Sequence, residues 1–294
     1  MKEDEIENYK KAGEVAKKVR EYANEILNEG INYGELADKI NEKIIELGMK
    51  PAFPVNISVN EIAAHDTALL NEERIIKKGD IVKVDIGVSF DGYIADTAFT
   101  KEISTSKNQD LIKASEEALK HAIEIVKPGI KISDIGRVIQ EKIKEFGFTP
   151  ISNLSGHHIA RYEIHTGESI PNIDNGSTRK LEIGDVIAIE PFATNGVGLV
   201  VEGRESEIYR VTGNGKARLA SSRELLSFLS REYDKLPFAK RWLRGFANLD
   251  FLLADLVRNS ILHNYHILRE KGFGLVSQFE HTILVLENPI ITTI

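Results

Sequence analysis

Part of the sequence occurs twice in the chain. Residues 30–49 and 129–148 align without gaps, and 8 of the 20 aligned positions are identical. Both copies open at a glycine, continue with apolar residues at helical spacing and close at a second glycine, which predicts an amphipathic helix. Segments 77–87 and 182–192 also match, because each has Gly-Asp followed by an apolar stretch. Two unrelated amphipathic helices of similar composition would explain one match, but not two matches in the same order. The chain therefore contains two similar halves.

This repeat restricts the fold class. Each half has the order helix, helix, strand, Gly-Asp turn and a strand that ends in a carboxylate, which is Asp85 in the first half and Glu190 in the second. A solenoid needs at least three repeats. Two copies instead predict a pseudo-twofold α+β fold whose half-sheets face one site. Because an unpaired buried charge is costly, carboxylates on buried strands predict a cation between the halves.

A hairpin signal brings a second carboxylate to this site. Asp91-Gly92 lies between two runs rich in β-forming residues, which predicts a two-residue turn. That turn pairs Gly87 with Asp96 and places Asp85 and Asp96 on one face as diagonal neighbours, about 7–8 Å apart. Two inward-facing carboxylates at this separation repel each other unless a cation bridges them.

Histidines and one further acid follow in the second half. His157 and His165 lie eight residues apart after a Ser-Gly turn, which puts them on the same side of an extended chain. His65 occupies the matching part of the first half, and Glu280 is an acid within an apolar segment. Four carboxylates and one imidazole are therefore candidate ligands: Asp85, Asp96, His157, Glu190 and Glu280.

This donor set indicates the metal and the reaction. The chain has no cysteine, so thiolate sites are excluded. Two divalent ions would balance four carboxylates, and the oxygen-rich set suits Co, Mn, Fe or Zn. Two ions about 3.5–4 Å apart can hold a bridging hydroxide and polarise a carbonyl. The predicted chemistry is hydrolytic, with the hydroxide attacking that carbonyl.

A third region interrupts the repeat. Residues 204–272 contain two helical patterns and a possible two-stranded wing at 265–276, which predicts a helical, winged-helix-like insertion. The predicted catalytic domain is then 1–203 with 273–294, and a strand over 276–286 would resume its sheet. The insertion holds thirteen Lys and Arg against eight Asp and Glu, a net charge of +5. A basic surface of this kind could steer the protein to ribosomal RNA.

Composition and missing motifs exclude several other classes. The formal net charge of −7 argues against a protein that binds nucleic acid over most of its surface. No signal peptide and no membrane-length apolar run is present, so we expect a cytoplasmic protein with no membrane partner, active as a monomer. The sequence contains no HExxH, GxGxxG, P-loop or GxSxG motif.

Four segments carry a family resemblance: VDIGVSFDGYIADTAFT, NLSGHHIARYEIHTGESIPN, AIEPFATNG and SQFEHTI. Together they resemble methionine aminopeptidases of type 2 in their archaeal form, over nearly the whole chain. The resemblance implies the pita-bread fold and removal of the N-terminal methionine from nascent proteins whose second residue is small and uncharged. It also implies that the five candidate ligands hold two divalent ions, with Asp96 and Glu280 bridging, and that His65 and His165 contact the substrate.

The remaining roles follow from this resemblance and from the chemistry of the side chains. Glu190 is the expected proton carrier, and His165 would stabilise the oxyanion or the amide nitrogen. His65 would lie near the peptide nitrogen or the second residue. The insertion is expected to form one wall of the methionine pocket, whose predicted lining is Phe53, Ile164 and Tyr265. Arg241 and Arg244 are the candidates for the basic face of the insertion.

Two alternatives remain open at this point. Another pita-bread hydrolase, such as an Xaa-Pro aminopeptidase or a prolidase, would share the five ligands. Such enzymes lack the late insertion and usually carry a separate N-terminal domain. The other alternative is a binding protein of the same fold, in which the metal-binding residues have been lost and which binds RNA or proteins. The complete set of candidate ligands in this chain favours the enzyme.

Overall fold

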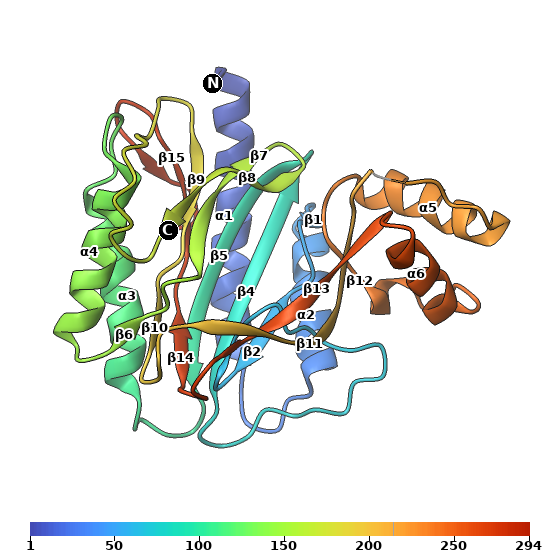
Figure 1. Cartoon of the computed structure of the whole chain (residues 1–294), viewed down its shortest axis with the longest axis horizontal. Coiled ribbons are helices and arrows are strands. Elements are labelled where there is room, and N and C mark those ends of the chain that lie inside the picture. Colours follow the sequence, from blue (N-terminus) through green and yellow to red (C-terminus); the bar gives the residue numbers. More distant parts are fainter. Residues whose placement is uncertain (214) are drawn as a thin grey trace.

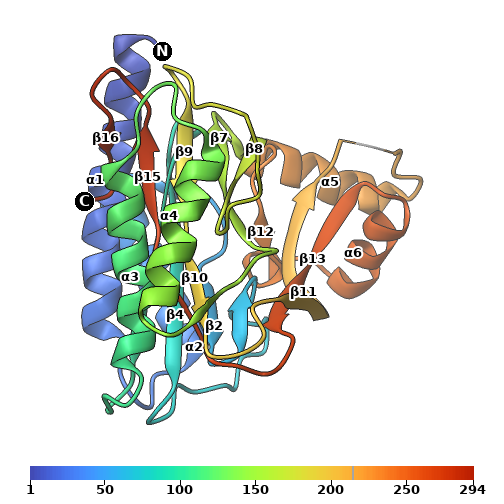
Figure 2. The ribbon, with the colours of Figure 1, turned by 60° about the vertical axis from the view of Figure 1, so that its left-hand side comes forward.

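The computed structural model describes residues 1–213 and 215–294, in which each half of the repeat contributes one helix pair (Figure 1). The four helices are α1 (Glu3–Ile26), α2 (Tyr33–Glu46), α3 (Gln109–Glu124) and α4 (Ile132–Glu145). α2 and α4 are the repeated helices, and each stops before a glycine with positive φ, Gly48 at 79° and Gly147 at 82°. Figure 2 shows α1, α3 and α4 together at the left of the view, with most of the strands to their right. No helix in these ranges has the length and apolar character needed to span a bilayer.

Antiparallel strands form the two half-sheets that these helices cover. The first half contains β1 (Lys50–Pro51), β2 (Asn56–Val59), β4 (Ile81–Phe90) and β5 (Tyr93–Glu102), with β4 between β1 and β2 and also paired with β5. The second half has the order β16-β15-β9-β7-β8. Its strands are β7 (Ser155–Ala160), β8 (Glu163–Pro171), β9 (Val186–Ile189), β15 (His281–Leu284) and β16 (Ile290–Ile291). A small sheet of β6 (Thr149–Pro150), β10 (Phe192–Thr194) and β14 (Val276–Gln278) lies beside them.

The Gly-Asp turns have the same hydrogen bonds in both halves. The backbone N–H of Lys77 donates to Asp80 Oδ2 at 2.8 Å, and that of Glu182 donates to Asp185 Oδ2 at 2.7 Å. An Asp side chain that accepts from the backbone in this way fixes a turn locally. The repeat found in the sequence is therefore also a repeat of local structure.

The predicted hairpin register is confirmed. Gly87 pairs with Asp96, and the turn residues Asp91 and Gly92 have φ of 49° and 84°, as a type I′ turn requires. One expectation was wrong, because Asp85 lies in the middle of β4 and not at its end. β4 runs on past Asp85 because the long hairpin with β5 keeps its backbone paired. Glu190, in contrast, directly follows β9 as expected.

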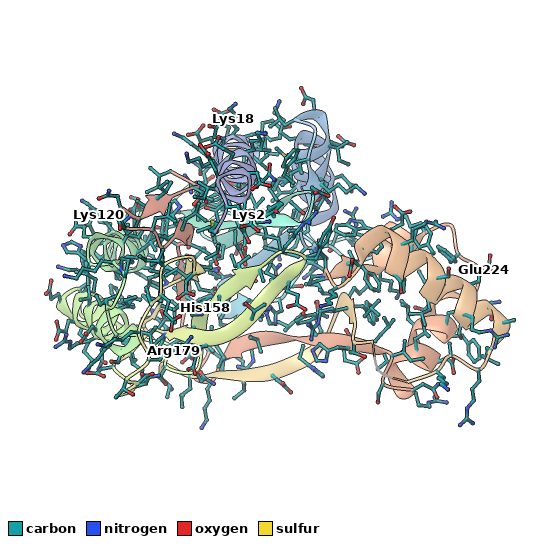
Figure 3. All side chains as sticks on the ribbon, turned by 90° about the horizontal axis from the view of Figure 1, so that it is seen from above. Lys2, Lys18, Lys120, His158, Arg179 and Glu224 are labelled. Carbon is teal, nitrogen blue, oxygen red and sulfur yellow. The ribbon has the colours of Figure 1, made fainter. Side chains whose placement is uncertain are left out.

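A long two-stranded ribbon carries the helices of the insertion. β11 (Val200–Val211) pairs with β13 (Leu262–Glu270), and β13 also pairs with β3 (Ile62–Ala64). Beyond β11 the chain continues through α5 (Ala220–Tyr233), β12 (Phe238–Ala239), the 3-10 helix η1 (Lys240–Leu243) and α6 (Leu249–Arg258). In Figure 3 Glu224 on α5 and Lys120 on α3 lie at opposite ends of the molecule. The insertion therefore projects to one side.

Two strand predictions near the end of the chain need correction. The wing expected at 265–276 does not form, because β11 is the partner of β13. After β13 the chain turns where the Glu270 carboxylate accepts the N–H groups of Gly272 and Gly274, at 2.6 and 2.9 Å. The single strand expected at 276–286 is two strands, β14 and β15, in different sheets. Glu280 lies at the break and bridges to Ala98 of β5.

Arg241 differs from the expectation of an exposed basic residue. Its guanidinium is buried and forms two hydrogen bonds to the carboxylate of Asp38 on α2, at 2.7 and 2.8 Å. This bidentate pair attaches η1 to the first half of the molecule. Arg244 is exposed, and it donates to the carbonyl of Leu70 at 3.0 Å.

Candidate metal centre

All five candidate ligands line one cavity between the two halves. Asp85 comes from β4, Asp96 from β5 and His157 from β7, while Glu190 follows β9 and Glu280 separates β14 from β15. The three segments of the second half meet the β4–β5 hairpin because β15 pairs with β9 and also contacts β5. Residues far apart in the sequence are thereby brought to one point.

His157 is the centre of this cluster. Its Nε2 lies 3.5 Å from Asp96 Oδ2, 3.9 Å from Glu190 Oε1 and 3.9 Å from Glu280 Oε1. All three separations exceed the length of a normal hydrogen bond. One ligand atom each from Asp96, His157 and Glu280 lies within 4.8 Å of the other two. An ion among these atoms could reach all three.

The electrostatics of the cluster favour a bound cation. Asp85 Oδ1, Asp96 Oδ1 and both carboxylate oxygens of Glu280 are buried without a hydrogen-bond partner. Burial raises the pKa of Asp96 to about 7. Burial, followed by repulsion from neighbouring carboxylates, raises the pKa of Asp85 and Glu280 well above their ordinary values. Buried oxygens of this kind are satisfied by metal coordination, so the residues present fit a divalent-ion site.

Three neutral side chains that the sequence interpretation missed support these acids. Gln278 donates from Nε2 to Glu190 Oε2 at 3.1 Å. The backbone N–H of Asp96 donates to the hydroxyl of Thr282 at 2.8 Å, and the hydroxyl of Thr97 donates to the carbonyl of Glu280 at 2.9 Å. Gln278 stands two residues before Glu280 in an apolar segment. That spacing was the available signal for it.

His165 and His65 lie beside the ligands. The rings of His157 and His165 meet edge to face with centroids 4.3 Å apart. His65 adopts a left-handed φ of 64°, and its ring meets Tyr265 at 5.3 Å. Burial lowers the pKa of His65 to about 4 and that of His165 well below its ordinary value. Both imidazoles are therefore neutral near pH 7 and each can donate one N–H.

The predicted pocket residues Phe53, Ile164 and Tyr265 also line the cavity. Its empty volume, including the part open to solvent, is about 510 Å³. A Cβ on Gly87 would lie 2.1 Å from the Phe53 ring, so this glycine is needed to seat Phe53. The sequence interpretation did not identify the other lining residues, Pro54, Asn56, Ala64, Ile208 and Pro237.

His158 lies on the other face of β7 and does not line the cavity. Its Nδ1 is 2.6 Å from the carbonyl of Glu168, and its Nε2 is 3.5 Å from Asp185 Oδ2. Adjacent residues of a strand point to opposite faces, which explains why only the first of the two consecutive histidines reaches the cluster.

Comparison with known proteins identifies the family. Residues 7–287 match the model of metallopeptidase family M24. The methionine aminopeptidase of Methanocaldococcus jannaschii is 47% identical, over 98% of this chain and 99% of that protein. The methionine aminopeptidase of Thermococcus onnurineus is 48% identical, over 99% of this chain and 100% of that protein. The chain belongs to metallopeptidase family M24, among its methionine aminopeptidases.

Solved structures of family M24 proteins share the fold. A methionine aminopeptidase from Thermotoga maritima has a TM-score of 0.73 and 26% identity, and covers 100% of this chain and 98% of that chain. A prolidase from Pyrococcus furiosus has a TM-score of 0.66 and 22% identity, and this chain spans only 64% of it. The predicted pita-bread α+β fold is confirmed, and membership in family M24 implies a hydrolase that uses divalent metal.

Proposed function

We propose that this metallopeptidase removes the N-terminal methionine from nascent polypeptides whose second residue is small and uncharged. The observation that carries the proposal is the set of converging, unpartnered carboxylate oxygens beside an apolar cavity. The name shared by its near full-length relatives, methionine aminopeptidase, supports the same substrate.

The ligand set proposed for two divalent ions (Co, Mn, Fe or Zn) has five members. Asp85, Asp96, His157, Glu190 and Glu280 would hold the ions, with Asp96 and Glu280 shared between them. Such ions, when bound, lower the pKa of water and polarise a carbonyl. Four carboxylates against two divalent ions leave the buried site without net charge, which supports the number two.

The protein's own groups would guide the proton and the developing charge. Gln278 donates a hydrogen bond to one carboxylate oxygen of Glu190, Oε2. The other oxygen lies towards His157 and the cavity, so Glu190 would carry the proton from the attacking water to the leaving amine. Neutral His165 would donate its N–H to the oxyanion or the amide nitrogen. His65 would lie against the peptide nitrogen or the second residue.

An apolar pocket of Phe53, Ile164 and Tyr265 would take the methionine side chain, with Ile208 and Pro237 extending it. Tyr265 and Ile208 come from the ribbon of the insertion. We expect Tyr265→Ala to raise KM for Met peptides with little change in metal content. Unchanged kinetics on a panel of Met peptides would refute the role of Tyr265 in the pocket wall.

Removal and return of metal test the main proposal. Metal-free protein should not cleave a Met-Gly-Met peptide, and Co, Mn or Fe should restore cleavage. Xaa-Pro dipeptides test the competing interpretation, a prolidase, and should remain uncleaved. Full activity after confirmed metal loss would contradict the proposal, and so would a preference for Xaa-Pro substrates.

The proposal extends to the setting of the enzyme. We propose a cytoplasmic monomer whose catalytic domain is 1–203 with 273–294 and whose insertion is 204–272.

Exposed Lys216, Arg218 and Arg223 near the start of α5 could bring the enzyme to ribosomal RNA. Arg241 is buried and cannot make such a contact. Reversing these three charges should weaken ribosome co-sedimentation at low salt and leave peptide kinetics unchanged. Unchanged co-sedimentation would refute the ribosome contact.

A further inference from the structure

The cavity wall continues outward along the β11–β13 ribbon. Ile208 of β11 and Tyr265 of β13 line the cavity. Further along the same strands Arg210 pairs directly with His263. Because alternate residues of a strand share a face, Arg210 and His263 lie on the cavity-facing side, one step beyond Ile208 and Tyr265. His263 is exposed whereas Tyr265 is only partly so, and this step therefore leads towards solvent.

The opposite face of the ribbon is already occupied. Tyr209, Val211 and Leu262 belong to the apolar core that α5 and α6 form. The residues between them in sequence must therefore point away from that core. Figure 1 shows the ribbon running from the main body out to α5 and α6. Its free face is a strip that leads out of the cavity.

Arg210 on this strip lacks a counter-ion among the described residues. In the part of the chain that the structure describes, its guanidinium forms no ion pair, and its Nε is buried without a hydrogen-bond partner. Neither His263 nor Tyr265, which lie beside it on the ribbon, supplies a negative charge near pH 7. Burial, and then the charge of Arg210, lower the pKa of His263; exposed Glu202 acts in the opposite direction. A partly buried, unpaired guanidinium is costly to maintain and fits an anion that arrives from outside.

Ring contacts connect this strip to the reaction site. The His263 and Tyr265 rings are in edge-to-face contact at 4.8 Å, and Tyr265 in turn contacts His65. Because His65 is proposed to lie near the peptide nitrogen or the second residue, these contacts lead from that part of the substrate towards Arg210.

We propose that Arg210, assisted by His263, forms a subsite for a carboxylate of the substrate downstream of the scissile bond. The inference rests on the proposed aminopeptidase function. Two residues of extended chain span about 6.6 Å, so a substrate whose first residues lie at Tyr265 would present its third or fourth residue to Arg210. The planar guanidinium can bind a carboxylate with two parallel hydrogen bonds.

Peptides with an acid at defined positions test the subsite in the metal-loaded enzyme. Met-Gly-Met-Met amides would carry Asp or Asn at the third or the fourth position. We expect kcat/KM to be about fivefold higher for Asp than for Asn at one of these positions. Arg210→Gln should abolish this difference while cleavage of the Asn peptides stays within about twofold. Arg258→Gln on the exposed end of α6 removes the same charge elsewhere and should keep the difference.

A second measurement uses only the wild-type protein, so it does not depend on whether a variant folds. In the wild-type protein the advantage of Asp should shrink as ionic strength rises from about 0.05 M to about 0.5 M, because salt screens a partly exposed ion pair. Tripeptides ending in a free acid or an amide distinguish a C-terminal carboxylate from a side-chain carboxylate. Equal rates for Asp, Asn and free-acid peptides would overturn the inference, and so would a preference that survives in Arg210→Gln. Failure to cleave any Met peptide would instead contradict the proposed function.

Discussion

Two neighbouring histidines show how position decides the role of one residue type. His157 Nε2 lies within 4 Å of three carboxylates, whereas the described structure gives His165 no such ion-pair contact. His165 instead packs edge to face on His157. This difference supports our proposal that His157 binds metal and that His165 contacts the substrate.

Alanine substitutions should separate these roles. His157→Ala removes a ligand atom and should lower the bound metal and the activity together. His165→Ala should keep the metal and lower kcat by about 10²–10³, the usual effect of losing an oxyanion donor. Metal analysis of the purified variants beside steady-state kinetics makes the comparison. Equal metal loss in both variants would contradict the assignment.

At the scale of elements, a carboxylate connects β5 to α3. Glu102 ends β5 and accepts the backbone N–H groups of Lys107 and Asn108, both at 2.9 Å, just before α3 begins. Burial alone would raise the pKa of Glu102, but these hydrogen bonds and those from nearby side chains lower it to about 2. An anion at a helix N-terminus also interacts favourably with the helix dipole.

This carboxylate should make stability depend on pH. Glu102→Gln should lower the free energy of unfolding by about 1–2 kcal/mol at pH 7. Because the folded pKa is below the unfolded value, the contribution is complete above about pH 4.5 and is lost as the pH falls towards 2. Urea unfolding at pH 7 and pH 3 should show the difference from wild type shrinking. Glu141→Gln on the exposed face of α4 should have no comparable effect, and a pH-independent deficit for Glu102→Gln would refute the explanation.

At the scale of the whole molecule, the insertion is joined to the first half by a charged contact. Arg241 of η1 is buried, and its partner Asp38 on α2 is half exposed. The pocket wall that includes Tyr265 belongs to the same insertion. The buried guanidinium therefore helps hold that wall in its place against the rest of the molecule.

Removing the carboxylate of Asp38 should show how much this contact contributes to stability. Asp38→Asn leaves the guanidinium of Arg241 without its counter-ion and should lower the unfolding free energy by about 1–3 kcal/mol. Arg244→Met, three residues from Arg241 but exposed, should change it by less than about 0.5 kcal/mol. Chemical denaturation of both variants provides the comparison. Equal stability of Asp38→Asn and wild type would show that the contact contributes nothing.

What could be predicted from the sequence depended on how local the cause is. The register that makes Asp85 and Asp96 diagonal neighbours is set by two turn residues, so it could be predicted directly. The partner of β13 could not, because β11 lies more than fifty residues away and local pattern alone favoured a wing. The burial of Arg241 likewise depends on Asp38, far away in the chain. The convergence of the candidate ligands was predictable only because the repeat relates the two halves.

The position of β15 has a consequence for the order of folding. This strand lies in space between β5 and β9, yet it is made almost 180 residues after β5. The two halves can pack their own helices early, but they cannot join into one sheet system until residues beyond 276 have been synthesised and inserted. Long-range closure of this kind is slow. A chain still lacking those residues would hold two partly finished halves and no complete ligand set.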